Sequence, residues 1–277
     1  MADAHRRAAM AERAARAGGA VARQSFRGEL QVETKADKND PVTEADRDAQ
    51  RQVVATIQEE FPGDAVLAEE DALPLGVDDD SGETLVDELP EGGDAWVVDP
   101  IDGTANFARG VGLWATSVAA VVDREPVASA TYVPTAGAVY TAGPASASRD
   151  GTTLATSDTD DPETFLVGLV GRWYPREASE FGGLCETLTE RVGDTRRIGS
   201  MQTTLAYLAD GGLDAVVGPM EHAPWDSLAG AHLVREAGGT VTDVEGNPWR
   251  VDSEGFVASN GEAHDAIVDA VRAGTGH

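Results

Sequence analysis

The stretch 96-WVVDPIDGTANFARG-110 places two carboxylates three residues apart, around a proline, after an apolar run. The apolar residues before Asp99 predict a buried strand that delivers this carboxylate to its C-terminal end. Pro100 fixes φ and removes a backbone donor, so the chain should leave the strand rigidly toward Asp102. Gly103 allows the backbone to approach a ligand closely, and a helix after it would offer free amide groups to an anion. Two acids beside an anion site indicate a hard divalent cation between them.

Three further acids stand where a strand is expected to end or a helix to begin: Glu69, Asp226 and Asp46. Each also has a plainer interpretation. Asp226 could merely cap the helix expected at 225–239, and Asp46 could merely complete a capping box with Thr43. In so acidic a chain, a single acid is more often a solvated charge. The prediction of a metal site therefore depends on the whole set, because several of its members lie at strand ends, where such residues are disfavoured.

The charge of the chain is strongly negative, with 49 acidic against 21 basic residues and a net charge of −28. Lysine occurs only as Lys35 and Lys38. A nucleic-acid-binding protein needs basic patches, so we expect no nucleic-acid partner. Self-repulsion should destabilise the compact state unless salt screens it. The composition thus favours a protein adapted to high salt, from a halophile, over an ordinary acidic protein from a mesophile.

The bulk composition is that of a globular protein, with 277 residues and 41% hydrophobic residues. This length suffices for one large domain or two modest ones. Cys185 is the only cysteine, so no disulfide can form within the chain, as fits a reducing compartment. The N-terminal segment lacks the apolar core of a signal peptide, and the longest mostly apolar run, 111–122, is too short to span a bilayer. We expect a cytoplasmic protein without a membrane partner.

The order of elements predicts an α/β fold whose two halves differ. Residues 1–156 should form an α+β subdomain with an antiparallel sheet and most metal ligands, because short connections between strands are typical of hairpins. Residues 157–277 alternate strands and helices, as in a layered α/β subdomain that would supply Asp226 and substrate contacts. The acidic segment 71–93 is interpreted as a solvated loop. Helices are expected at 4–25, 43–61, 178–192, 225–239 and 261–273, and strands at 65–69, 95–99, 113–123, 126–133, 137–142, 165–171, 213–218, 240–244 and 256–260, with a short strand, a turn and a helix in 195–212.

Four segments resemble signatures of the inositol monophosphatase family and follow that family's order. VVDPIDGTANF (97–107) resembles D-P-[ILM]-D-[GS]-T, and WDSLAGAHLVREAGG (225–239) resembles W-D-x-x-A-G followed by E-A-G-G. DPVTEAD (40–46) resembles D-x-V-T-x-x-D, and LAEED (67–71) resembles G-E-E with alanine in place of glycine. The resemblance extends from residue 35 to about residue 270. It implies a layered αβαβα sandwich of the inositol monophosphatase and fructose-1,6-bisphosphatase type.

The resemblance also implies Mg²⁺-dependent hydrolysis of a phosphomonoester, with two to three ions in each site. Carried onto this chain, one ion would be bound by Glu69, Asp99 and the carbonyl of Ile101. A second would be bound by Asp99, Asp102 and Asp226, and a third would share Glu69. With Asp99 bridging two ions, the close spacing of the two aspartates is explained. One ion would activate water and another would stabilise charge on the leaving oxygen.

Catalytic and phosphate-binding roles carry over in the same way. Thr104 and Asp46 would orient the attacking water, with Glu69 beside them, and the backbone amides of Gly103 and Thr104 would bind phosphate. Lys35 matches a basic position near the site. No serine or cysteine nucleophile is needed. The Gly103-Thr104 turn also argues against a plain cation-binding protein without turnover.

The segment RRIGSM (196–201) resembles the part of the family that lies beside the substrate. We therefore expect substrate contacts from four of its residues: Arg196, Gly199, Ser200 and Met201. Met201 stands where the family usually has alanine. Pro219 stands where many members have a glutamate that contacts substrate hydroxyls. Glu221 and His222 could replace that glutamate, although a surface loop explains them equally well.

The substrate implied first is inositol 1-phosphate. Fructose 1,6-bisphosphate follows closely, as sole or second activity, because archaeal members of the family resemble enzymes with both activities. 3′-Phosphoadenosine 5′-phosphate and histidinol phosphate are further alternatives. A regulatory binding protein of the same fold is the alternative without catalysis; loss of a metal ligand would mark it, and every ligand position is filled. The family also implies a homodimer.

Overall fold

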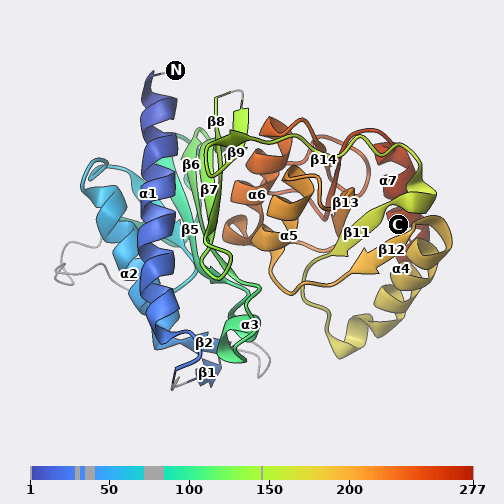
Figure 1. The fold of residues 1–277 in the computed structure, drawn as a ribbon, viewed down its shortest axis with the longest axis horizontal. Helices are drawn as coiled ribbons and strands as arrows, with labels where there is room; N and C mark the ends of the chain where they lie inside the picture. Colours follow the sequence, from blue (N-terminus) through green and yellow to red (C-terminus); the bar gives the residue numbers. More distant parts are fainter. Residues whose placement is uncertain (1, 29–31, 35–40, 72–83, 145, 277) are drawn as a thin grey trace.

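The computed structural model describes residues 2–28, 32–34, 41–71, 84–144 and 146–276, which form five layers (Figure 1). Across the molecule, two helices are followed by a large sheet, two more helices, a small sheet and a last pair of helices. The paired helices are α1 (Ala2–Ser25) with α2 (Glu44–Gln58), α5 (Met201–Ala209) with α6 (Pro224–Glu236), and α4 (Ala178–Arg191) with α7 (His264–Thr275). The expected αβαβα sandwich is confirmed.

The large sheet has the strand order β10-β9-β8-β7-β6-β5-β3-β4. Neighbouring strands are antiparallel from β5 to β10, which confirms the predicted hairpins, whereas β3 runs parallel to both β4 and β5. The strands are β3 (Ala65–Ala68), β4 (Leu85–Val86), β5 (Asp94–Asp102), β6 (Ala115–Val122), β7 (Glu125–Val133), β8 (Ala138–Gly143), β9 (Ser146–Arg149) and β10 (Thr152–Thr153).

The small sheet has the order β12-β11-β13-β15-β14 and comes from the second half of the chain. Its strands are β11 (Leu166–Leu169), β12 (Asp194–Arg196), β13 (Ala215–Gly218), β14 (Thr240–Thr242) and β15 (Phe256–Ser259). β11 pairs in parallel with β12 and β13, and β15 is antiparallel to its neighbours. The shorter elements are the strand pair β1 (Val32–Thr34) and β2 (Pro41–Thr43), the helix α3 (Thr104–Ala108), and the 3₁₀ turns η2 (Pro162–Thr164) and η3 (Pro175–Glu177).

Both faces of the large sheet are buried, which explains why β5 is apolar at consecutive positions instead of alternating. Trp96 and Val98 pack in the core beneath α1 and α2. Val97, between them, packs on the opposite face in the core shared with α5 and α6. That second core contains residues from both halves of the chain, so a division into subdomains after residue 156 stays a prediction.

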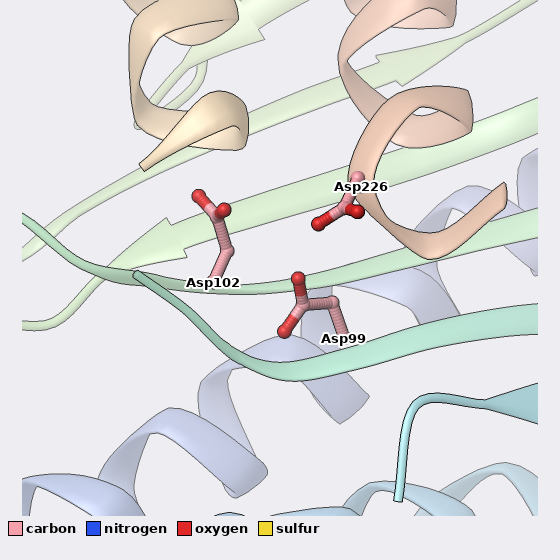
Figure 2. A group of neighbouring side chains, drawn as sticks. All are labelled: Asp99, Asp102 and Asp226. Carbon is pink, nitrogen blue, oxygen red and sulfur yellow. The ribbon is translucent and has the colours of Figure 1, made fainter. Parts of the chain in front are cut away.

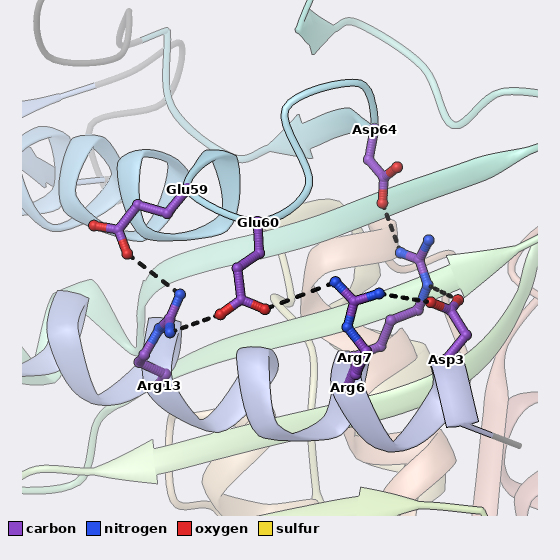
Figure 3. A network of polar contacts seen from close by, with 7 residues as sticks. All are labelled: Asp3, Arg6, Arg7, Arg13, Glu59, Glu60 and Asp64. Atoms are coloured by element: carbon purple, nitrogen blue, oxygen red, sulfur yellow. Dashed lines mark hydrogen bonds and ion pairs between the residues drawn. The ribbon is translucent and has the colours of Figure 1, made fainter.

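A buried arginine fixes the start of α1 to the rest of the N-terminal layer (Figure 3). Arg7 is 2% exposed and donates to Asp3 at 2.9 Å, Asp64 at 2.6 Å and Asp94 at 2.8 Å. The indole of Trp96 also donates to Asp64, at 2.9 Å. One guanidinium therefore joins α1 to the loop before β3 and to the first residue of β5.

Two sequence expectations need correction. The strand predicted at 95–99 runs on through Pro100 to Asp102, because a shift in its register with β6 accommodates the proline, as bulges do. The loop predicted at 71–93 contains β4, and Leu89 is buried, while residues 72–83 lie outside the described part. Within the described ranges, no helix combines the length and apolar character that crossing a membrane requires.

Candidate active site

Three carboxylates converge between the end of β5 and the start of α6 (Figure 2). Asp99, Asp102 and Asp226 each offer an oxygen, and these oxygens lie within 4.8 Å of one another. In a regular strand, residues three apart point to opposite faces. The register shift between Asp99 and Asp102 removes this opposition, so that both side chains reach the same site. The bulge, and not the proline alone, therefore brings the two aspartates together although they are three residues apart.

Asp99 lies in the most unfavourable position of the three. It is 1% exposed, and its Oδ1 has no hydrogen-bond partner among the described residues. Burial raises the pKa of Asp99 well above its usual range, and the charges of its neighbours Glu69, Asp102 and Asp226 raise it further. A buried acceptor without a donor is costly. A divalent cation with a preference for oxygen ligands satisfies both the orphaned oxygen and the mutual repulsion, so this donor set fits Mg²⁺.

Asp102 is held by the N-terminus of α5. Its Oδ1 accepts from the backbone N–H of Met201 at 3.0 Å, and its Oδ2 accepts from the N–H of Gln202 at 2.8 Å and from the hydroxyl of Ser200. Burial raises the pKa of Asp102 to about 6, and these donors oppose the shift. A carboxylate at a helix N-terminus is favoured by the helix dipole. α5 therefore sets the position of this predicted ligand.

Asp46 caps its own helix and also contacts a residue of the site. Its Oδ2 accepts from the backbone N–H and the hydroxyl of Thr43, at 2.8 and 2.6 Å, which confirms the capping box. Its Oδ1 lies 3.2 Å from the hydroxyl of Thr104, which is also 3.0 Å from the carbonyl oxygen of Ile101. Burial raises the pKa of Asp46 to about 6, and the charge of Glu69 contributes. The structural and the functional interpretation of this acid are thus compatible.

Strand pairing brings Glu69 beside Asp99. The backbone N–H of Glu69 donates to the carbonyl of Val98 at 3.2 Å, which continues the pairing of β3 with β5. Gly103 follows the aspartates with φ +91°, and α3 begins at Thr104. A Cβ at Gly103 would lie 3.0 Å from the carbonyl oxygen of Gly199, a tight contact that requires a small shift of the backbone. Conformation and space therefore both favour glycine at this turn.

A cavity of about 870 Å³ opens onto these groups. The rest of its lining includes residues 169–177, Arg197 and residues 220–223. Glu221 and His222, named above both as candidate replacements for the missing glutamate and as a surface loop, line it. The ring of His222 lies 3.1 Å from the carbonyl of Gly218, and burial lowers the pKa of His222. The residues of the predicted site that line this cavity are Glu69, Asp99, Ile101, Asp102, Gly103, Thr104, Gly199, Ser200, Met201 and Asp226.

The remaining predicted residues are placed differently. Arg196 lies on β12 and pairs with Asp194 at 2.5 Å, away from the cavity, whereas the next residue, Arg197, lines it. Asp46 does not line the cavity and reaches the site through Thr104. Lys35 lies outside the described residues.

Sequence reasoning missed one wall of the cavity, the segment GRWYPRE at 171–177. It carries two arginines and two aromatic residues in a chain with only 5% aromatic residues. It also stands between a strand and a helix, where loops often line sites. This unusual composition was the signal that could have identified the segment.

Comparisons with known proteins identify the family of this chain. The model of the inositol monophosphatase family matches residues 3–275. A fructose-1,6-bisphosphatase/inositol-1-monophosphatase of Thermotoga maritima is 33% identical, over 87% of this chain and 86% of that one. An inositol-1-monophosphatase of Bacillus subtilis is 32% identical, over 92% of both chains. The solved inositol monophosphatase TM1415 of Thermotoga maritima superposes with a TM-score of 0.81 at 29% identity, over 94% of both chains.

Relatives of similar identity carry other names. A histidinol-phosphatase of Streptomyces coelicolor is 32% identical over 87% of this chain and 86% of that one. A Nus factor SuhB of Pseudomonas aeruginosa is 31% identical over 95% and 94%. Identity at this level thus leaves the substrate open, while the family match spans nearly the whole chain. The chain belongs to the inositol monophosphatase family, and it is a phosphoric monoester hydrolase.

Proposed function

We propose that this chain hydrolyses a phosphomonoester of a small polyol or sugar with Mg²⁺, and that inositol 1-phosphate is its preferred substrate. The observation that carries the proposal is the convergence of Asp99, Asp102 and Asp226 within 4.8 Å, beside the Gly103 turn. A divalent cation would offset the repulsion among these crowded carboxylates, two of which are buried, and the adjacent turn offers amide groups to an anion. A phosphate ester bridged to metal would meet both requirements.

Two to three Mg²⁺ ions would be held by Glu69, Asp99, the carbonyl of Ile101, Asp102 and Asp226. When bound, such ions polarise water and phosphoryl oxygens and stabilise charge on the leaving oxygen. The donor set of carboxylate and carbonyl oxygens suits Mg²⁺ better than a softer metal, because histidine and cysteine are absent from the cluster of three aspartates.

The protein's own groups would orient the reactants. The N–H groups of Gly103 and Thr104 would bind phosphate oxygens at the start of α3. The hydroxyl of Thr104 has Asp46 and the carbonyl of Ile101 as acceptors for its one proton, so its oxygen is free to accept a hydrogen bond from the attacking water. Phosphoryl transfer depends chiefly on positioning and charge stabilisation, and this arrangement supplies the positioning.

Fructose 1,6-bisphosphate is the second candidate, as a sole or additional substrate. Three arginines line the same cavity as the carboxylates: Arg172, Arg176 and Arg197. Guanidinium groups suit a second phosphate group, which inositol 1-phosphate lacks. Pro219 stands where many family members have a glutamate that binds substrate hydroxyls, and this difference also weakens the case for a polyol substrate. 3′-Phosphoadenosine 5′-phosphate and histidinol phosphate complete the set of substrates to be compared.

The test is phosphate release in high-salt buffer, with and without Mg²⁺, from inositol 1-phosphate and fructose 1,6-bisphosphate in parallel. Mg²⁺-dependent release is expected, and the ratio of kcat/KM identifies the preferred substrate. The matched control is Asp160→Asn, which removes an exposed carboxylate far from the cluster in the chain, against Asp99→Asn. Release without Mg²⁺, or equal loss in both variants, contradicts the proposal. A small-molecule phosphate ester as sole partner, a homodimer and a cytoplasmic location stay predictions.

A further inference from the structure

We propose that Gln202 is a positioning residue that fixes the spacing between Asp102 and Asp226, and so sets the affinity of the site for metal. The inference rests on the proposed function, because it takes these two aspartates as ligands of Mg²⁺. Gln202 does not line the cavity and would act through the ligands, without touching the substrate.

Gln202 is bonded toward both aspartates at once. It lies in the first turn of α5 and is 0% exposed. Its backbone N–H donates to Oδ2 of Asp102 at 2.8 Å. Its side-chain Nε2 donates to the carbonyl oxygen of Trp225, also at 2.8 Å, and Trp225 immediately precedes Asp226. One residue therefore connects a ligand on β5 with the helical turn that carries a ligand on α6.

The start of α6 has no side-chain cap of its own. Its N-cap residue, Ala223, makes no side-chain hydrogen bond, and Pro224 follows without an N–H. The N–H of Asp226 donates within the same turn, to the carbonyl of Ala223 at 3.1 Å. First turns of helices that lack a cap are the part most prone to fray. The amide of Gln202 supplies a link from another helix at this point.

Stability alone does not account for a glutamine here. Its Oε1 is buried and has no hydrogen-bond partner among the described residues. This oxygen faces the close contact of α5 with α6, where a Cβ on Gly230 would lie 3.0 Å from it. An unpaired buried carbonyl destabilises a fold, and an apolar side chain of the same length would avoid that loss. We therefore attribute the side-chain donor of Gln202 to the positioning of the metal ligands.

A second buried glutamine is used in the same way on the other side of the site. Gln50 of α2 is 0% exposed. Its Nε2 donates to the carbonyl of Glu70 at 2.5 Å, and its Oε1 accepts from the N–H of Glu70 at 2.8 Å. Glu70 directly follows Glu69, a predicted ligand. Both side-chain amides thus form hydrogen bonds with the backbone next to a predicted ligand and not with the ligand itself.

The test compares Gln202→Met and Gln202→Asn with Ser129→Ala. Met keeps the length and removes the donor, while Asn keeps an amide that is one methylene too short to span the gap. The control is matched because the hydroxyl of Ser129, also buried, donates to another carbonyl of α6, that of Ala229 at 3.0 Å. Only the Gln202 contact lies next to a ligand. Mg²⁺ is titrated calorimetrically without substrate, and melting is followed in EDTA.

Both Gln202 variants should bind Mg²⁺ about tenfold more weakly, as is usual when a residue that orients a metal ligand is removed. At saturating Mg²⁺ their KM for substrate should equal that of the wild type, and Gln202→Met should melt in EDTA no lower than the wild type. Ser129→Ala should keep its Mg²⁺ affinity within twofold. If one Gln202 variant does not fold, the other decides.

Two results overturn the inference alone: wild-type Mg²⁺ affinity in the Gln202 variants, or an equal loss of affinity in Ser129→Ala, which would indicate general loosening of α6. A wild-type protein that binds no Mg²⁺ is a different outcome. It overturns the proposed function, and the inference with it.

Discussion

The hydroxyl of Thr104 lies 3.2 Å from Oδ1 of Asp46, although 58 positions separate the two residues. Asp46 uses its other oxygen, Oδ2, to cap α2 through Thr43. One carboxylate thus ties the start of α2 to the start of α3. Because the cap fixes Asp46 rigidly, the threonine hydroxyl that points at it is fixed as well.

Thr104→Ala should lower kcat by about 100-fold and leave KM nearly unchanged, because a water-orienting group acts mainly in the transition state. Steady-state kinetics at saturating Mg²⁺ would measure this split. Thr104→Ser, which keeps the hydroxyl, is the control and should retain most of the activity. An increase in KM at constant kcat would assign Thr104 to substrate binding instead.

Asp99→Asn should abolish nearly all turnover, because the proposed ions share this ligand. The same change should raise the melting temperature in EDTA, since it removes a carboxyl whose ionised form is opposed by burial and by the charges of Glu69, Asp102 and Asp226. Phosphate release and thermal melting of the same preparation would test both effects. Substantial remaining activity contradicts the shared ligand, and a lower melting point contradicts the repulsion.

The fold followed from the sequence where periodicity and turns were clear. The hairpins between β5 and β8, and the helices α1, α2, α4 and α7, lie close to their expected positions. The sequence could not show that β5 continues through Pro100, because a register shift depends on pairing with β6. β4 was missed because two residues carry no periodicity and are defined only by pairing with β3.

The acidic residues of the site could be predicted from the sequence, whereas the segment 171–177, which also lines the cavity, could not. Asp99, Asp102 and Asp226 were identified by spacing and resemblance, and the structure brings them together. Arg197, the residue directly after β12, lines the cavity where Arg196, the last residue of that strand, was expected. The contribution of Gln202 was invisible, since it depends on a contact between two helices.

The stabilisation of the protein by Mg²⁺ should increase from pH 5.5 to pH 8. Burial raises the pKa of Asp102 to about 6 and that of Asp99 well above its usual range. Carboxyls with a raised pKa take up protons on folding, so their contribution to metal-free stability is present at low pH and is lost as pH rises through the raised pKa, which is about 6 for Asp102. Mg²⁺ must displace these protons, so its affinity rises as they leave.

The measurement is the difference in melting temperature with and without Mg²⁺ at each pH. Burial lowers the pKa of His232 to about 4, which destabilises the fold as pH falls below the ordinary histidine value. That effect is present with and without metal, so the difference cancels it. A difference that is flat with pH would contradict metal binding at these carboxylates.

Arg7→Met should destabilise the fold by about 3 kcal/mol, whereas Arg13→Met should cost less than about 1 kcal/mol (Figure 3). The side chain of Arg7 is 3% exposed and has three acidic partners, of which Asp64 is itself largely buried. Arg13 pairs with Glu59 and Glu60 at the surface, where water screens the charges. Urea unfolding at fixed salt would compare them. Equal losses of unfolding free energy would show that the buried ion pairs of Arg7 stabilise the fold no more than the exposed pairs of Arg13.

The melting temperature of the wild-type protein should rise steeply as KCl increases from dilute buffer to several molar. The net charge of −28 is spread over a single chain, so its self-repulsion opposes folding most at low ionic strength. At about 1 M salt the screening length falls to about 3 Å, which leaves short ion pairs but removes the longer-range repulsion.

Sucrose at matched osmolality serves as control, because it favours compact states without screening charge. A sharp melting transition that is unchanged between dilute buffer and molar KCl would reject adaptation to high salt. The acidic composition would then be explained by solubility alone.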